Sequence, residues 1–237
     1  MTAHESQITS SSVATRIDHT LLKAEATQAE ILRLCEEAVS HGFHAVCVNG
    51  RWVSTAADRL QGTSVAVCTV VGFPLGAGTT KAKVAETQDA IHAGADEIDV
   101  VADLAAIVEG DARYLLHQLM SVLRACRTIR PPVLLKTIIE SAALTHDQKV
   151  FACEIAQQAG VDFLKTSTGF HAAGGATVED VALMKQTAPR CRIKASGGIK
   201  TAQQAIAMLE AGADRIGTSA GVAIVEELRE HDRGIRQ

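Results

Sequence analysis

The sequence is poor in aromatic residues and in proline. Aromatics make up 3% of the 237 residues, with one tryptophan and one tyrosine, and there are four prolines. A hydrophobic core in this chain must therefore be built mainly from alanine, valine, isoleucine and leucine. No Pro/Gly/Ser-rich linker divides the sequence, so we expect a single domain.

An excess of one charge and long apolar runs are also missing. The formal net charge is −4 and basic residues do not cluster, which argues against nucleic acid as a partner. No apolar run approaches the roughly 20 residues that a spanning helix needs, so we expect no membrane association. Residues 1–13 are polar and rich in Ser and Thr, without the basic and apolar parts of a signal peptide, and we expect this segment to be loosely ordered.

Closely spaced cysteines and histidines are absent as well. The nine histidines show no H-x-H or H-E-x-x-H spacing, so no metal site is predicted. The cysteines form no C-x-x-C pair and are typical of small buried residues in a reducing compartment, which favours a cytoplasmic location. The six are Cys35, Cys47, Cys68, Cys126, Cys153 and Cys191.

What the sequence does contain is one alternating pattern over most of its length. Short β-branched runs occupy residues 14–21, 44–49, 64–74, 97–103, 132–140, 162–168, 192–198 and 215–221. Candidate helices lie between them at 27–42, 79–93, 111–128, 145–159, 177–187 and 201–211. Such alternation indicates parallel strands with helical crossovers, and eight strands match a (β/α)₈ barrel. We predict one α/β TIM barrel over residues 14–237; a doubly wound sheet, which usually has fewer strands, is the alternative.

Charged residues interrupt several of these predicted strands. Strands of a closed parallel barrel are covered on both faces and should be almost entirely apolar. A single charge could be a strand end or an internal ion pair, but several charges near the C-terminal halves of their strands indicate one shared pocket on the face where barrel enzymes carry their sites. The residues concerned are Asp18, Asp99, Lys136, Lys165 and Lys194.

Lys165 and Lys194 fall at matching places on neighbouring predicted strands. Adjacent strands lie about 4.8 Å apart, so the two ammonium groups could approach to roughly 6 Å. At an effective dielectric constant of about 20 they would repel by about 2.8 kcal/mol, enough to lower the pKa of one lysine from about 10.4 towards 8. A neutral amine forms Schiff bases with carbonyl compounds, and Asp99 could transfer the protons. The repulsion is symmetrical and does not select the nucleophile.

Small residues follow the last three predicted strands, in "STGF" (167–170), "ASGGI" (195–199) and "GTSAG" (217–221). Glycine lets the backbone approach an anion closely, and the N–H groups at a helix start favour negative charge. Loops after strands 7 and 8 often bind phosphate in this fold, although the glycines could simply make tight turns. We predict a small phosphorylated carbonyl compound as substrate.

The motifs "DEIDVV" (96–101), "LLKTIIE" (134–140), "FLKTSTGF" (163–170), "IKASGGI" (193–199) and "IGTSAG" (216–221) closely resemble the 2-deoxyribose-5-phosphate aldolases, a family of class I aldolases. The resemblance implies reversible cleavage of 2-deoxy-D-ribose 5-phosphate to acetaldehyde and D-glyceraldehyde 3-phosphate, with no metal or organic cofactor. It implies that Lys165 forms the Schiff base, that Lys194 lowers its pKa and that Asp99 relays protons. The implied phosphate site comprises Gly169, Gly197, Gly198, Gly217 and Ser219.

The chain departs from this family at a few positions. Phe170 stands where some members carry lysine, Ala220 where many carry serine, and Asp103 where asparagine is common. Some members also end in a tyrosine-bearing tail, whereas the one tyrosine here is Tyr114.

Other residues could also belong to the pocket or support it. Cys47 could line the pocket, as could Asp18 and Lys136, and we expect Lys136 to pair with Glu140. A transaldolase-like enzyme for longer sugar phosphates and a non-catalytic sugar-phosphate sensor are the alternative functions. A homodimer is expected from the broad helical flanks of a barrel.

Overall fold

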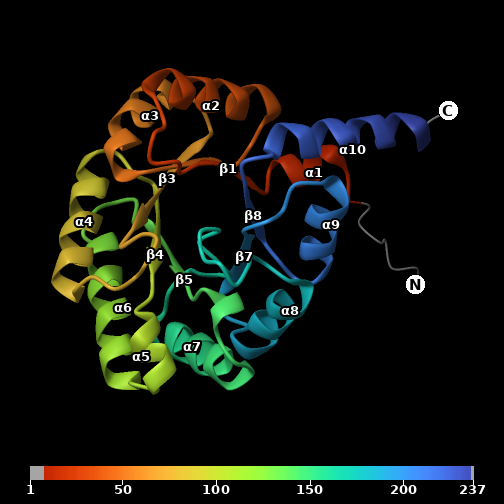
Figure 1. The fold of residues 1–237 in the computed structure, drawn as a ribbon. Coiled ribbons are helices and arrows are strands. Elements are labelled where there is room, and N and C mark those ends of the chain that lie inside the picture. Colours follow the sequence, from red (N-terminus) through yellow and green to blue (C-terminus); the bar gives the residue numbers. More distant parts are fainter. Residues whose placement is uncertain (1–7, 236–237) are drawn as a thin grey trace.

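Eight parallel strands close into a barrel in chain order, β1 to β8, and helices surround it (Figure 1). The computed structural model describes residues 8–235. Each strand pairs with the next, and β8 pairs with β1. The predicted TIM barrel is therefore confirmed. The strands are β1 Ile17–Leu21, β2 Ala45–Val48, β3 Ala66–Val71, β4 Glu97–Val101, β5 Leu134–Ile138, β6 Phe163–Lys165, β7 Arg192–Ser196 and β8 Arg215–Thr218.

The predicted helices form where capping residues begin and end them. In the first of them, Thr27 and Glu30 make a reciprocal capping box and Gly42 ends the helix in the left-handed conformation. None of the helices among the described residues is long and apolar enough to cross a membrane. The helices are α1 Ser10–Ala14, α2 Gln28–His41, α3 Val53–Leu60, α4 Thr80–His92, α5 Leu104–Glu109, α6 Ala112–Cys126, α7 His146–Ala159, α8 Val178–Thr187, α9 Ala202–Glu210 and α10 Gly221–Ile235, with 3₁₀ turns at Gly50–Trp52 and Ser141–Ala143.

The N-terminal segment is more ordered than predicted. Residues 1–7 lie outside the described part of the chain, but the expectation of a loose segment is wrong for residues 10–13, which belong to α1. Thr9 and Ser12 cap this helix reciprocally, and Val13 is fully buried. Figure 1 shows α1 beside the C-terminal helix α10. The Ser/Thr-rich composition that suggested disorder thus supplies helix caps instead.

Apolar packing divides into two layers, because successive side chains of a strand point to opposite faces. Val46, Val48 and Leu164 belong to the large cluster between the strands and the helices. A smaller cluster lies inside the barrel: Leu22, Ala45, Cys47, Cys68 and Val70. Its residues come from β2, β3 and the start of the loop after β1, so the interior facing β4 to β8 is left to other side chains.

Candidate active site

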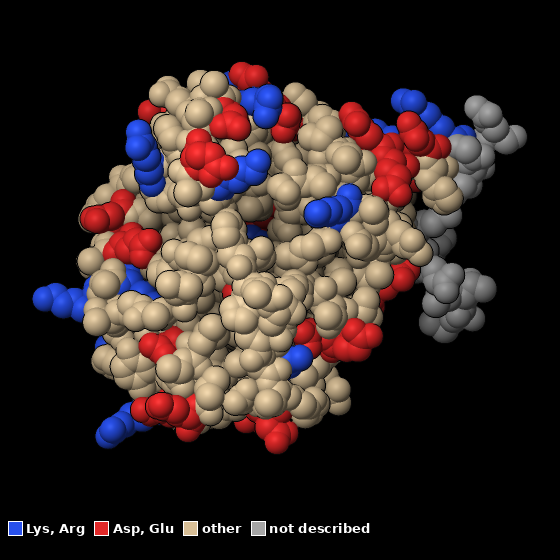
Figure 2. Space-filling view, in the orientation of Figure 1, with Lys and Arg blue, Asp and Glu red and all other residues tan. Residues whose placement is uncertain are grey.

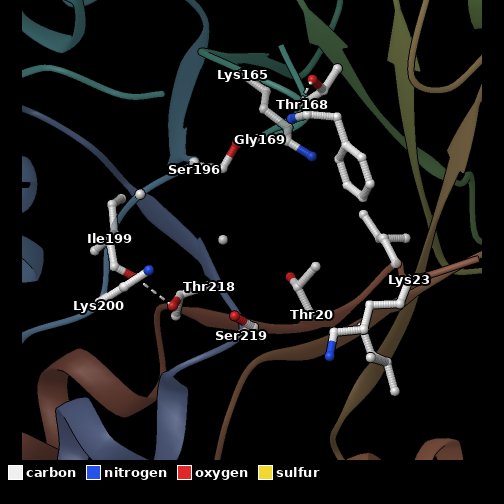
Figure 3. Close-up of a pocket in the computed structure, with 16 residues that line it drawn as sticks. Thr20, Lys23, Lys165, Thr168, Gly169, Ser196, Ile199, Lys200, Thr218 and Ser219 are labelled. Atoms are coloured by element: carbon white, nitrogen blue, oxygen red, sulfur yellow. Dashed lines mark hydrogen bonds between the residues drawn. The ribbon is translucent and has the colours of Figure 1, made fainter. Parts of the chain in front are cut away.

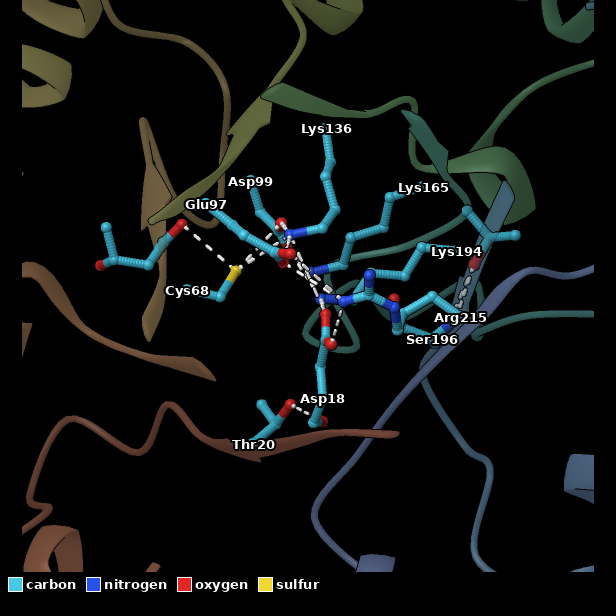
Figure 4. A network of polar contacts seen from close by, with 12 residues as sticks. Asp18, Thr20, Cys68, Glu97, Asp99, Lys136, Lys165, Lys194, Ser196 and Arg215 are labelled. Carbon is cyan, nitrogen blue, oxygen red and sulfur yellow. Dashed lines mark hydrogen bonds and ion pairs between the residues drawn. The ribbon is translucent and has the colours of Figure 1, made fainter. Parts of the chain in front are cut away.

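The charged strand residues meet inside the barrel (Figure 4). Parallel register brings them together, because Asp99 of β4 is opposite Lys136 of β5, and Lys165 of β6 is opposite Lys194 of β7. Asp99, Lys136 and Lys194 are 0% exposed and Lys165 is 3% exposed. The structure therefore places the three predicted catalytic residues in one buried cluster.

Asp99 binds three ammonium groups at once. Its Oδ2 atom accepts hydrogen bonds from Lys165 Nζ and Lys194 Nζ, each at 2.8 Å. Its Oδ1 atom accepts one from Lys136 Nζ at 2.9 Å. Burial alone would raise the pKa of this carboxyl, but the neighbouring ammonium groups hold the pKa well below its usual value. Asp99 is therefore an ionised acceptor at the centre of the site.

Two further members, Glu97 and Arg215, were missed in the sequence. Glu97 Oε2 lies 2.5 Å from Lys136 Nζ, and Arg215 Nη1 lies 2.7 Å from Asp18 Oδ1 and 3.3 Å from Glu97 Oε2. Glu97 precedes Asp99 by two residues and so shares its face of β4, a parity that could have identified it. Glu97 and Arg215 are the first residues of β4 and β8, and a charged residue at the start of a strand is common.

The cluster contains one more cation than carboxylates. The cations are Lys136, Lys165, Lys194 and Arg215, and the carboxylates are Asp18, Glu97 and Asp99. If one lysine of the cluster loses its proton, three positive charges face three negative charges. A buried cluster with balanced charges avoids the large cost of an unpaired charge.

At Lys194 the predicted repulsion between the two lysines is offset by neighbouring carboxylates. The Lys194 ammonium group pairs with both Asp18 and Asp99. Burial would lower the pKa of Lys194, but these carboxylates raise it above its ordinary value. Repulsion between two like charges is therefore only part of the electrostatics here, because Asp18 and Asp99 lie beside the two ammonium groups.

The expected ion pair between Lys136 and Glu140 is wrong. Lys136 points into the barrel towards Asp99 and Glu97. Glu140 lies beyond the end of β5 and accepts hydrogen bonds from Thr168, at 3.1 Å from the backbone N and at 2.5 Å from Oγ1. Glu140 thus supports the loop after β6.

A pocket of about 270 Å³ opens above the cluster, and Lys165 is the cluster residue that lines it (Figure 3). Figure 2 shows a hollow near the centre of this face, with blue and red side-chain atoms at its floor. Asp18, Cys47 and Lys136, named as possible pocket residues, lie deeper in the barrel and are fully buried. All predicted phosphate residues do line it: Gly169, Gly197, Gly198, Gly217 and Ser219.

The glycines of this pocket serve different purposes. Gly198 has a φ of +81° and nothing within 4 Å of where a Cβ would lie, so its turn leaves space beside the backbone. A Cβ on Gly217 would come within 2.9 Å of Lys194 Cε. Gly217 therefore also makes room for a buried lysine of the cluster. The sequence predicted only phosphate binding or a tight turn for this glycine.

Two lysines of the pocket were not predicted. Lys23 follows β1 and Lys200 follows β7, and both line the cavity. Figure 3 shows their ammonium groups on different sides of it. No Asp or Glu is among the described residues that line the pocket. The signal in the sequence is a lysine directly after "DHTLL" and another directly after "ASGGI".

An aromatic wall closes another side of the pocket. Phe170 lines it and is 55% exposed, and its ring makes an edge contact with Phe73 at 5.2 Å between centroids.

Asp103, a further departure from the resembled family, is the N-cap of α5 and accepts a hydrogen bond from Ala106 N at 3.0 Å. Asp103 is absent from the ion pairs of the catalytic cluster.

Potential metal ligands also lie in the barrel interior. Cys47, Cys68 and Asp99 bring ligand atoms within 4.8 Å of one another. However, Lys136 Nζ lies 3.3 Å from Cys68 Sγ and 2.9 Å from Asp99 Oδ1. The positive charge that these ligand atoms would seek from a metal ion is therefore supplied by the Lys136 ammonium group. The donor set is better suited to the lysine than to a metal ion.

The family model of the DeoC/LacD family aldolases matches residues 12–227. A deoxyribose-phosphate aldolase of Geobacillus sp. (strain WCH70) is 52% identical over 90% of this chain and 95% of its own. One of Brevibacillus brevis is also 52% identical, over 88% and 93%.

Two solved aldolase structures are also similar to this chain. A tetrameric deoxyribose phosphate aldolase from Aeropyrum pernix has a TM-score of 0.87 at 28% identity, over 94% of this chain and 93% of its own. The aldolase QR15 has a TM-score of 0.87 at 39% identity, over 93% and 97%.

Proposed function

The chain belongs to the DeoC/LacD family of aldolases, and we propose that it reversibly cleaves 2-deoxy-D-ribose 5-phosphate to acetaldehyde and D-glyceraldehyde 3-phosphate. Relatives that are 52% identical carry the name deoxyribose-phosphate aldolase. The observation that carries the proposal is Lys165, an amine that joins a buried charge cluster to the pocket.

Lys165 is the better nucleophile of the two lysines that the sequence left open. Lys194 is 0% exposed and is held by two carboxylates, Asp18 and Asp99. Among the residues that the structure describes, Lys165 forms an ion pair with Asp99 alone, and it lines the cavity. Loss of its proton balances the charges of the cluster, and its nitrogen can then attack a carbonyl in the pocket.

Asp99 is placed to move the protons of this sequence. Its Oδ2 atom lies 2.8 Å from Lys165 Nζ, within the range for direct transfer. When Lys165 loses its positive charge, one of the groups that keep Asp99 acidic disappears, and the carboxylate becomes a better base. Lys194, still charged, holds the same oxygen in place.

The proposed reaction proceeds through a covalent imine on Lys165. The Lys165 nitrogen adds to the substrate aldehyde, and loss of water gives a protonated imine. The C3 hydroxyl then loses its proton, the C2–C3 bond breaks to release D-glyceraldehyde 3-phosphate, and the electron pair of that bond flows into the imine to form an enamine. Protonation of the enamine carbon and addition of water release acetaldehyde and restore the Lys165 amine.

We infer that the substrate phosphate lies at the glycine turns after β7 and β8. Gly197, Gly198 and Ser219 line the pocket, and Lys200 adds a cation there. Thr201 caps α9 directly after Lys200, so the first N–H groups of that helix face the same end of the barrel. These features favour a dianion over a neutral sugar.

A comparison of substrates tests the proposed function. We expect kcat/KM for deoxyribose 5-phosphate to exceed that for larger ketose phosphates by at least about 100-fold, since the enzyme discriminates by transition-state contacts. A preference for the ketose phosphates would support a transaldolase-like enzyme. Tight binding of sugar phosphates without turnover would support a sensor, although a pure binder has no use for a reactive amine.

Assembly and location are further proposals. We propose that two or more copies associate, which is supported by the tetramer formed by the Aeropyrum pernix relative; light scattering would show a mass above 25.0 kDa. A homodimer and a cytoplasmic location remain our predictions. All six cysteines are free and buried, which supports a reducing compartment.

A further inference from the structure

We propose that Lys23 is a specificity-determining residue that contacts the phosphate group of the substrate from the β1 side of the pocket. This inference rests on the proposed function, because it concerns the phosphorylated end of that substrate. It assigns to the loop after β1 a role that neither the glycine turns nor Lys200 supplies.

The closure of the barrel places Lys23 opposite the predicted phosphate turns. Strand β1 pairs with β8, with Asp18 opposite Gly217 and His19 opposite Thr218. Continuing this register by one residue brings Thr20 of β1 beside Ser219, three residues before Lys23. Lys23 and Ser219 line the same pocket, and Figure 3 shows the Lys23 side chain directed along its wall towards Ser219.

The backbone of Lys23 is fixed on both sides. Leu22, directly before it, is buried in the apolar cluster inside the barrel. The Lys23 carbonyl accepts hydrogen bonds from Ala26 N at 3.2 Å and from Asn49 Nδ2 at 3.4 Å. The exposed side chain thus starts from an anchored position at the rim of the pocket.

The Lys23 ammonium group has no carboxylate partner within ion-pair distance among the residues that the structure describes. Glu30, whose charge interacts with Lys23, is already engaged: its Oε2 accepts hydrogen bonds from Thr27 N and Thr27 Oγ1, each at 2.8 Å. A cation that lines a pocket without acidic residues, and that has no internal partner, is suited to an anionic ligand.

The wall formed by the loop after β6 increases the need for this cation. Phe170 presents an aromatic ring to the pocket and cannot pair with a phosphate. The positive charges near the phosphate must therefore come from the loops after β1 and β7, which carry Lys23 and Lys200. Together they can balance the two negative charges of a phosphate monoester.

The test uses Lys23→Met, with Lys23→Arg to restore the charge and Lys81→Met as the matched control. Lys81 is exposed in the first turn of α4 and does not line the pocket. Kinetics would be measured with deoxyribose 5-phosphate and with unphosphorylated 2-deoxyribose, and inorganic phosphate would be titrated as a competitive inhibitor.

We expect Lys23→Met to raise the KM for deoxyribose 5-phosphate and the Ki for inorganic phosphate by about tenfold, as for loss of one charge-assisted hydrogen bond. The preference for the phosphorylated sugar should fall by a similar factor. Lys23→Arg should stay within about threefold of the wild type, and Lys81→Met should match it.

Equal effects of Lys23→Met on both sugars, or an equal effect of Lys81→Met, would overturn the proposal. Failure of the proposed function would look different, because the wild type would then not turn over deoxyribose 5-phosphate. In that case calorimetric titration with inorganic phosphate still decides the role of Lys23. Weaker phosphate binding by Lys23→Met would support it, and unchanged binding would contradict it.

Discussion

Asp99 shows how a single residue organises the charges of the site. Its two oxygens bind Lys136, Lys165 and Lys194, so each ammonium group is positioned through one carboxylate. Polarity within predicted strands was enough to find Asp99, Lys165 and Lys194 in the sequence. It was not enough to find Glu97 and Arg215, because a charge at the start of a strand is ordinary and only the register reveals its partners.

Replacement of Asp99 by asparagine should preserve the shape of the site and remove its base. We expect kcat for deoxyribose 5-phosphate to fall by about 10²- to 10⁴-fold, the usual contribution of a positioned proton-transfer group. Circular dichroism and inorganic phosphate binding should remain close to the wild type. A kcat within twofold of the wild type would remove Asp99 from the mechanism.

Lys83 is a second buried lysine, outside the catalytic cluster. Its ammonium group donates to the Val101 carbonyl at 2.7 Å and to Gln118 Oε1 at 3.0 Å, both uncharged acceptors. Its side chain is among the fully buried ones. Burial lowers the pKa of Lys83 to about 8. Lys83 thus braces the end of β4 at the cost of a buried charge.

The sign of the resulting pH dependence follows from proton binding. Between about pH 8 and pH 10.5 the folded chain has released the Lys83 proton while the unfolded chain retains it, so folding becomes more favourable as pH rises. In urea unfolding, the wild type should gain up to about 3 kcal/mol relative to Lys83→Met over this range. A stability difference that is independent of pH would contradict this account.

At the scale of elements, caps and glycines made the long helices predictable. Short helices such as α5 were not predicted, because six residues show too little hydrophobic periodicity and the N-cap residue, Asp103, resembles a loop residue in the sequence. The observed β6 ends at Lys165, shorter than predicted, because Thr166 to Thr168 turn into the loop that lines the pocket. Strand ends depend on contacts between elements, which periodicity does not report.

Glu140, after β5, accepts hydrogen bonds from Thr168 in the loop after β6. Its replacement should therefore loosen that loop. Glu140→Ala leaves the buried Thr168 N–H and hydroxyl without their acceptor, which should cost about 1 to 3 kcal/mol of stability. We expect KM to rise severalfold while acetaldehyde still reacts with Lys165. Glu109→Ala, at the exposed end of α5, is the matched control, and identical KM values in the two variants would argue against a positioning role.

At the scale of the whole molecule, the charge cluster connects strands that are far apart in sequence. Asp18 of β1, Glu97 and Asp99 of β4, and Arg215 of β8 belong to one network. Repeated strand and helix patterns were sufficient to predict the closed barrel. The depth of each side chain was not predictable, since a pattern of period two separates inside from outside but does not separate the floor of the pocket from the layer below.

The cluster should make the molecule sensitive to acid. Although burial opposes it, the surrounding cations lower the pKa values of Asp18, Glu97 and Asp99, so these carboxylates stabilise the fold above their ordinary pKa values, and this contribution is lost as pH falls below about 4. Glu97→Gln removes one such group. Its unfolding free energy, measured in urea from pH 5 to pH 3, should fall less steeply, by up to about 1.4 kcal/mol per pH unit. Parallel slopes for the two proteins would contradict the prediction.

Chemical trapping of the Schiff base would show directly which lysine is the nucleophile. The enzyme would be incubated with acetaldehyde and borohydride, digested, and mapped by mass spectrometry, with Lys165→Arg treated in parallel. We expect a reduced ethyl adduct on the peptide that contains Lys165 and none at that site in the variant, because Lys165 is the amine of the cluster that lines the pocket. An adduct confined to Lys194, or no adduct at all, would contradict this prediction.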